Sequence, residues 1–168
     1  MRNKRVRKLV LAALFAALCC MMTMIVSIPA PTGYVNLGDC AVLLSGWVLG
    51  PVWGGAAAGI GSMLADVLNG WVSYAPATLI IKALMAVCAA LIAQKIKGRF
   101  GMTIGALVSA CVMALGYLVY ESAILAYGAA ALASVPANLI QGAVGAAAGV
   151  GVAWLLERSG VLTRIKQE

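Results

Sequence analysis

Long apolar runs, separated by short polar or proline-containing breaks, make up most of the chain. A helix of about 20 apolar residues is long enough to cross a bilayer, and its backbone satisfies its own hydrogen bonds there. The pattern therefore predicts an all-α membrane protein in which residues 1–168 form a single transmembrane domain. It predicts six transmembrane helices, at residues 9–28, 39–50, 52–68, 77–94, 102–127 and 136–156.

Glycine, proline and polar residues mark the ends of these predicted helices. Pro29 and Pro31 lack the backbone donor that a continuing helix needs, and Gly50-Pro51 separates the second helix from the third. Because the second helix is short, we expect it either to begin before Asp39 or to be shielded by its neighbours. Residues 69–76 predict a turn whose aromatic side chains suit the membrane interface.

The composition agrees with a membrane protein and argues against several other classes. Hydrophobic residues make up 64% of the chain and charged residues 10%, with a mean hydropathy of +1.02, whereas soluble domains are nearer half apolar and a quarter charged. The five cysteines show no Cys-x-x-Cys spacing and histidine is absent. We therefore expect no metal site, no cofactor and no catalytic residues, and we interpret the cysteines as reduced packing residues.

The net charge of +7 has a topological explanation. Eleven of the twelve cations fall at the N-terminus, between the fourth and fifth predicted helices, or in the C-terminal tail. Six spans place these segments on one side, which the positive-inside rule makes cytoplasmic, so we expect both termini there. Anionic lipid headgroups, not nucleic acid, are the expected electrostatic partners. The eleven cations are Arg2, Lys4, Arg5, Arg7, Lys8, Lys95, Lys97, Arg99, Arg158, Arg164 and Lys166.

Polar residues within the predicted helices collect at one depth. Ionisable groups are costly in hydrocarbon, so those that occur there are candidates for function. No midplane relay, internal repeat or Gly-rich ATP-binding motif accompanies them, which favours an outward-facing binding site that depends on a partner for energy. With both termini inside, the outer third contains Asp39, Asp66, Lys82, Glu121, Asn138 and Gln141.

Each of these residues also has a purely structural interpretation. Asp39 could cap the second helix, and Asp66 could lie in water at the interface. Lys82 could reach the outer interface or pair with one of the three acids. Asn138 and Gln141 share a helix face and could simply join helices by hydrogen bonds. Their common depth on five helices favours a site.

Aromatic residues follow the same distribution along the chain. An interfacial aromatic belt explains much of it, but the same rings could stack on a flat heterocycle. The outer segments 29–37 and 69–76 could close over such a ligand. The outer aromatic residues are Tyr34, Trp71, Tyr74, Tyr117, Tyr120 and Tyr127.

Small residues recur four positions apart on three of the predicted helices, which lets another helix approach closely. We expect internal packing for the stripes on the third and sixth helices, which include Gly55 with Gly59 and Gly145 with Gly149. For the first helix, an intermolecular surface is at least as well supported. Its stripe consists of Ala12, Ala13, Ala16 and Ala17.

Several of these motifs together resemble a known family. In chain order they are the Ala12/Ala16 stripe, Gly33-Tyr-Val-Asn-Leu-Gly-Asp39, Leu49-Gly-Pro51, Gly59-Ile-Gly-Ser-Met-Leu-Ala-Asp66, Tyr74-Ala-Pro-Ala-Thr78 and Ile81-Lys82. The combination resembles the substrate-binding S component of energy-coupling factor (ECF) vitamin transporters. It is most similar to the branch assigned to riboflavin, hydroxymethylpyrimidine or pyridoxine-type substrates. The first four helices carry the motifs, and the last two match by length and hydropathy.

The resemblance implies a multi-pass protein of the prokaryotic plasma membrane that binds a vitamin at the extracellular side. Uptake then depends on a transmembrane T component and two ATPase subunits, and the S component is thought to topple in the bilayer to release its substrate. The alanine stripe of the first helix would be the docking surface, and residues 33–39 would be the gate. Pyridoxine-type compounds or hydroxymethylpyrimidine are the most expected substrates, with riboflavin next.

The candidate substrate-binding residues combine these motifs with the polar residues at the same depth. The last three on the following list depend on depth alone, because the fifth and sixth helices carry no matching motif. The candidates are Tyr34, Asn36, Asp39, Tyr74, Thr78, Lys82, Glu121, Asn138 and Gln141.

The alternative that the sequence leaves open is a small secondary transporter or channel that oligomerises to build its pathway. It predicts gradient-dependent uptake by this chain alone. An S component instead binds tightly on its own and supports uptake only with the ATPase module. A membrane enzyme has no supporting nucleophile–base pair or metal cluster in the sequence.

Overall fold

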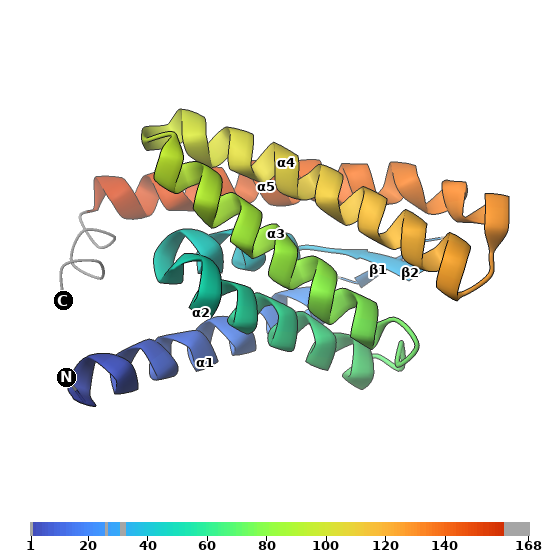
Figure 1. The fold of residues 1–168 in the computed structure, drawn as a ribbon, viewed down its shortest axis with the longest axis horizontal. Helices are drawn as coiled ribbons and strands as arrows, with labels where there is room; N and C mark the ends of the chain where they lie inside the picture. The colour runs from blue at the N-terminus through green and yellow to red at the C-terminus, as the bar shows by residue number, and fades with distance from the viewer. Residues whose placement is uncertain (1, 26, 31–32, 160–168) are drawn as a thin grey trace.

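Helices account for nearly all of the structure, as the apolar runs predict. The computed structural model describes residues 2–25, 27–30 and 33–159. Five helical stretches in this part of the chain are long and apolar enough to cross a membrane. They are built from α1 (Arg2–Ile25), α2 (Gly38–Leu68), α3 (Ala75–Lys95), α4 (Gly98–Val119) with the π-helical turn η1 (Tyr120–Ile124), and the 3₁₀ helix η2 (Gly128–Ala133) with α5 (Ser134–Arg158) (Figure 1).

The ends of these helices correct several predicted boundaries. α1 begins within the basic N-terminal segment and ends at Ile25, three residues before the predicted end at residue 28. α3 and α4 leave only residues 96–97 between them, so most of the gap left between the predicted helices, residues 95–101, is helical. The helix predicted over 102–127 ends with η1 at Ile124, and Ala126 has a left-handed φ of 58°, which ends a helix.

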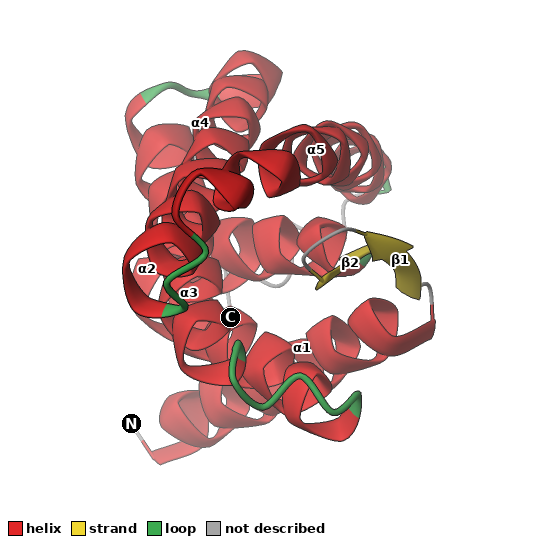
Figure 2. Ribbon diagram, turned by 90° about the vertical axis from the view of Figure 1, so that its right-hand side faces the viewer, coloured by secondary structure: helices red, strands yellow, loops and turns green. Residues whose placement is uncertain are grey.

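A β-hairpin, which the apolar pattern did not predict, follows α1. Strand β1 (Ser27–Ala30) pairs antiparallel with β2 (Gly33–Asn36), with Ser27 opposite Asn36. Pro29 cannot continue a helix but fits a two-stranded sheet, where one edge of each strand needs no backbone partner. Figure 2 shows the hairpin between α1 and α5. It therefore covers the end of the molecule at which the polar residues were expected.

Within α2 the chain reverses its direction at Gly50. This residue has φ 81° and ψ 179°, a conformation that glycine adopts readily, and Pro51 follows it. The Ser45 hydroxyl donates to the Gly54 carbonyl at 3.0 Å, although nine residues of straight helix would separate them by about 13 Å. Residues 38–49 and 51–68 therefore run in opposite directions and pack against each other near the reversal. The predicted break at Gly50-Pro51 is confirmed.

Small residues let the backbones of neighbouring helices touch. A Cβ atom placed on Gly61 would overlap the Ala16 carbonyl of α1, and one on Gly59 would lie 2.6 Å from the Leu79 carbonyl oxygen of α3. In a bilayer such close packing replaces the hydrophobic effect as the main attraction between helices. The glycines of α5 pack in the same way on α2, where Gly145 lies against Asp39 and Gly149 against Leu43. The internal packing expected of the third and sixth predicted helices is therefore confirmed.

α1 is the least enclosed of the five membrane-length stretches. In its apolar 18-residue segment 11% of the residues are buried, against 33–61% in the corresponding segments of the other four. Its alanine stripe divides between two faces. Ala12 and Ala16 are partly buried, and Ala16 contacts α2, whereas Ala13 and Ala17 are exposed. Only half of the predicted docking stripe is therefore freely available on the surface.

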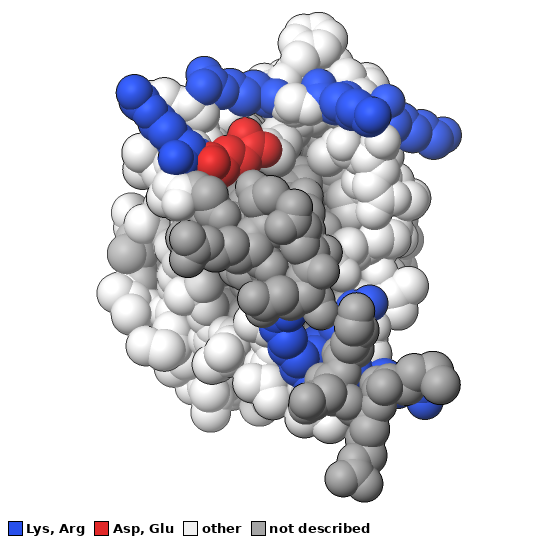
Figure 3. Space-filling model, turned by 90° about the vertical axis from the view of Figure 1, so that its left-hand side faces the viewer, with Lys and Arg blue, Asp and Glu red and all other residues white. Residues whose placement is uncertain are grey.

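The two ends of the molecule differ in charge. The start of α1, the end of α5 and the α3–α4 connection lie together at one end (Figure 1), and Figure 3 shows Lys and Arg gathered on that face. Arg164, Lys166 and the side chains of Arg2 and Lys4, which were predicted for the same side, lie outside the described residues. The β-hairpin, the 69–74 turn and η1 lie at the opposite end.

Candidate functional site

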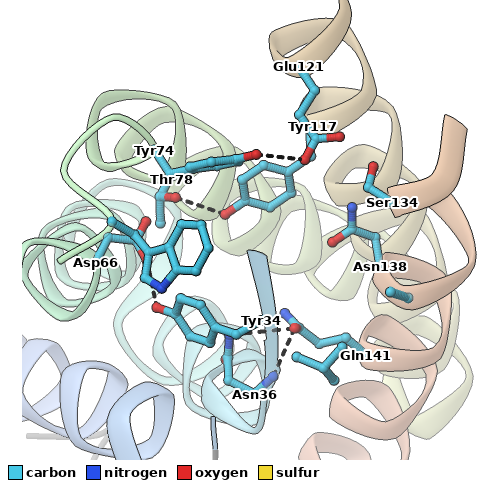
Figure 4. Close-up of a pocket in the computed structure, with 13 residues that line it drawn as sticks. Tyr34, Asn36, Asp66, Tyr74, Thr78, Tyr117, Glu121, Ser134, Asn138 and Gln141 are labelled. Carbon is cyan, nitrogen blue, oxygen red and sulfur yellow. Dashed lines mark hydrogen bonds between the residues drawn. The ribbon is translucent and has the colours of Figure 1, made fainter. Parts of the chain in front are cut away.

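A pocket lies at the end opposite the basic face, and we call it the distal pocket. Its free volume is about 50 Å³, far below the roughly 300–1,000 Å³ of sites that enclose small organic molecules. A ligand of that size therefore needs the lining segments to move. The lining comes from β2, α2, the 69–74 turn, α3, α4, η1 and α5, and comprises Tyr34, Val35, Asn36, Asp66, Trp71, Tyr74, Thr78, Tyr117, Glu121, Ser134, Ala137, Asn138 and Gln141 (Figure 4).

Seven of the nine candidate residues line this pocket; they are Tyr34, Asn36, Tyr74, Thr78, Glu121, Asn138 and Gln141. The other two, Asp39 and Lys82, lie outside the lining. The candidate set omitted Asp66, Trp71 and Tyr117, although their depth and aromatic character were signals that could have included them. Val35, Ser134 and Ala137 carried no such signal.

An aromatic row joins the β-hairpin to the 69–74 turn. The ring of Tyr34 lies 6.1 Å from that of Trp71, and Trp71 meets Tyr74 edge-on at 5.8 Å. Tyr74 continues the row to Tyr117, with 6.4 Å between ring centres. Such pairs are modestly attractive and present ring faces and edges to a ligand. The two segments expected to close over a ligand are therefore in contact through their side chains.

Two tyrosines of this row donate to carboxylates in the pocket wall. Tyr34 Oη donates to Asp66 Oδ1 at 2.6 Å, and Tyr74 Oη donates to Glu121 Oε1 at 3.2 Å. Burial raises the pKa of both phenols above the ordinary value of about 10, and the nearby carboxylates raise it further. Both tyrosines therefore stay protonated, as hydrogen-bond donors, at neutral pH.

Beneath the pocket lies a hydrogen-bonded cluster that we call the floor; it consists of Asn36, Asp39, Lys82, Met113 and Gln141. Lys82 Nζ forms an ion pair with Asp39 Oδ1 and lies 3.0 Å from Met113 Sδ. Gln141 Nε2 donates to Asp39 Oδ2 at 2.9 Å, and Gln141 Oε1 accepts from the backbone N–H of Asn36 at 2.9 Å. The floor thus joins β2, α2, α3, α4 and α5.

The floor decides between the structural interpretations of its residues. α2 begins at Gly38 with Leu37 at the N-cap position and no side-chain cap, so the capping interpretation of Asp39 is wrong. Of the partners considered for Lys82, the structure selects Asp39. Gln141 both joins helices and lines the pocket, where it lies beside Asn36 (Figure 4).

The described residues contain no group of three or more His, Cys, Asp or Glu side chains that could hold a metal ion. The lining of the distal pocket offers aromatic rings, hydroxyls, amides and carboxylates. Such groups can bind and orient a ligand by stacking and hydrogen bonding.

Comparison with known proteins decides what kind of protein carries this pocket. Residues 3–158 match the family model described as "ECF-type riboflavin transporter, S component". The chain belongs to this family of ECF transporter S components. It is therefore a subunit of a transporter in the plasma membrane, not an enzyme. The match to this family confirms the resemblance stated from the motifs. S components of ECF transporters bind a vitamin and act with a T component and ATPases.

Two individual proteins are similar to this S component. A solved structure described as the S component of a bacterial ECF transporter superposes with a TM-score of 0.75 at 21% identity, and covers 94% of this chain and 98% of that one. A Pyrococcus woesei protein named "Uncharacterized protein in gap 3'region" is 34% identical over 139 residues, which are 81% of this chain and 92% of that protein. The structural likeness shows a shared fold.

Proposed function

We propose that this S component binds a small heterocyclic vitamin or vitamin precursor in the distal pocket and delivers it together with an ATP-driven ECF module. A pyridoxine-type compound or hydroxymethylpyrimidine is the most expected substrate, and riboflavin is next. The observation that carries the proposal is the pocket itself. Aromatic rings and hydrogen-bonding groups from seven elements converge on it at the end remote from the basic face.

The proposed orientation places the distal pocket outside the cell. The basic end then faces the cytoplasm, in keeping with the positive-inside rule, and both termini lie there. The reversal at Gly50 supports six crossing segments in one transmembrane domain, since residues 38–49 and 51–68 run in opposite directions. Residues 38–49 span only about 18 Å as a helix. This segment begins in the floor of the distal pocket and ends beside Lys97 at the basic end, so it crosses the inner part of the bilayer and β2 leads into it from the outer side.

The β-hairpin and the 69–74 turn are the proposed gate. They touch through Tyr34 and Trp71, and the pocket beneath them is too small for a vitamin while they do. Opening separates this aromatic pair and breaks the hydrogen bond from Tyr34 to Asp66. A bound heterocycle then replaces the lost contacts by stacking between the rings.

The exposed part of the alanine stripe on α1 is the proposed docking surface for the T component. Ala13 and Ala17 are exposed on the least enclosed helix, whereas Ala12 and Ala16 are partly buried and the Ala16 backbone packs against Gly61 of α2. Ala17→Trp is expected to abolish copurification with the T component and leave vitamin binding intact. Leu115→Trp, which places the same bulky side chain on the exposed face of α4, is the matched control and should leave both copurification and vitamin binding intact.

Ligand binding by the purified chain tests the central proposal. The panel consists of pyridoxine, pyridoxamine, hydroxymethylpyrimidine, riboflavin and thiamine, measured by thermal shift and by tryptophan fluorescence. Because Trp71 lines the pocket, a true ligand should quench fluorescence in the wild type and in Trp154→Phe, but much less in Trp71→Phe. Failure of every compound to bind, with no copurifying ATPase, would contradict the proposal.

Reconstitution in liposomes separates this function from a gradient-driven transporter. The chain alone should bind the vitamin and should not transport it under a proton or sodium gradient. Uptake should appear only when the T component, both ATPase subunits and ATP are added. Uptake by the chain alone would establish the alternative instead.

A further inference from the structure

Two acidic side chains in the wall of the distal pocket each keep one oxygen without a partner. Asp66 is 5% exposed and Glu121 is 2% exposed. One oxygen of each accepts from a tyrosine, as described above. Among the described residues, Asp66 Oδ2 and Glu121 Oε2 are buried and accept no hydrogen bond. Since buried polar atoms are nearly always paired in folded proteins, two such atoms in one pocket point to a ligand that completes them.

No described lysine or arginine lines the pocket beside these carboxylates. Lys82, the cation buried nearby, is engaged by Asp39 in the floor. A carboxylate oxygen accepts hydrogen bonds, so a ligand that completes Asp66 Oδ2 and Glu121 Oε2 does so with N–H or O–H donors.

Local backbone structure at Glu121 supports a role in binding. Glu121 lies in η1, the π-helical turn at the end of α4. Such turns are rare in proteins as a whole, and those that occur are often at functional sites. Figure 4 shows the Glu121 side chain reaching toward Tyr74 at the pocket. The carboxylate of Glu121 thereby faces the 69–74 turn, which is part of the proposed gate.

We propose that the distal pocket selects an unphosphorylated heterocycle that carries at least two hydrogen-bond donors and is neutral or cationic. One donor pairs with Glu121 and one with Asp66. A phosphate ester of the same compound is rejected, because its negative charges would lie beside two carboxylates in a poorly solvated site. This inference rests on the proposed function, since it names the chemistry of the vitamin that the same site takes.

The test compares each binding compound of the panel with its own phosphate ester. Dissociation constants are measured for the wild type, Glu121→Gln and Asp66→Asn. We expect the phosphate ester to bind the wild type at least tenfold more weakly than the parent compound. Glu121→Gln keeps an acceptor for Tyr74 but turns an NH₂ group toward the ligand, so the parent compound should bind at least tenfold more weakly and the preference over its ester should shrink.

Glu157→Gln is the matched control, because it makes the same change at an exposed position near the basic end. It should leave both dissociation constants unchanged. Thermal unfolding and gel filtration check that each variant is folded, and Asp66→Asn carries the test if Glu121→Gln does not fold.

The outcomes distinguish this inference from the function on which it rests. Equal binding of a vitamin and its phosphate ester, with unchanged affinity in the folded Glu121→Gln or Asp66→Asn variant, would overturn the inference and leave the proposed function intact. Binding of no compound in the panel would overturn both.

Discussion

The floor and the wall of the distal pocket bury acidic side chains in opposite ways. In the floor, one oxygen of Asp39 pairs with Lys82 and the other accepts from Gln141. In the wall, Asp66 and Glu121 each accept from one tyrosine and keep a second oxygen unpaired. The floor is complete without a ligand, whereas the wall is not. Acidic residues that the sequence places in the same outer third are thus fully paired in one region and keep an unpaired acceptor in the other.

Breaking the floor has the largest expected effect on stability. Lys82→Met leaves the Asp39 carboxylate buried without its counter-charge, which costs about 3–5 kcal/mol in comparable buried pairs. The melting temperature in detergent should fall sharply, or the protein should fail to purify in folded form. Lys95→Met, the control, removes an exposed lysine at the other end of α3 and should leave the melting temperature unchanged. Equal melting temperatures for the wild type and Lys82→Met would show that the ion pair does not hold the floor together.

Removing both charges from the floor should reverse most of that loss. In the double variant Asp39→Asn/Lys82→Met no unpaired charge is left in the floor, and the asparagine oxygen can still accept from Gln141. We expect a stability within about 1–2 kcal/mol of the wild type and a vitamin affinity within a few-fold. A large loss of affinity in this folded double variant would instead make Lys82 or Asp39 a direct ligand-binding residue.

Cutting one link between the gate and the wall should have a smaller effect. Tyr34→Phe removes the hydrogen bond to Asp66 and should destabilise the protein by about 1 kcal/mol at neutral pH. Because burial and Asp66 raise the pKa of Tyr34, the folded chain keeps the phenol proton at a pH where the unfolded chain has lost it. Wild-type stability therefore falls as the pH rises above about 10. Denaturant titrations at pH 7.5 and pH 10.5 should show the difference between the two proteins shrinking.

Neutralising the wall should have the smallest effect on stability. Glu121→Gln removes a buried charge that has no cationic partner in the lining, so the melting temperature should stay the same or rise slightly. The same thermal scans that follow Lys82→Met measure it. If Glu121→Gln destabilised the protein as much as Lys82→Met, the wall would be structural like the floor, and the contrast between the two regions would disappear.

Much of the site was predictable because depth in a membrane is encoded in the order of residues along the chain. Counting from the breaks placed Glu121, Asn138 and Gln141 at one level, and all three line the pocket. Depth did not distinguish the roles of Asp39 and Asp66, which begin and end the same element α2. Their difference depends on how each segment is rotated about its axis and on the chain reversal between them.

The sequence by itself determined the class of protein, the main helices, the breaks at Pro29 and Gly50, the basic end and the family. These features depend on hydropathy, backbone chemistry and charge placement, which are local or additive along the chain. Only the tertiary structure decided that residues 27–36 form a β-hairpin, that Lys82 pairs with Asp39, and that the carboxylates of Asp66 and Glu121 stay partly unpaired. Each of these outcomes depends on which groups from distant segments meet, and the close packing of small residues between the helices sets those distances.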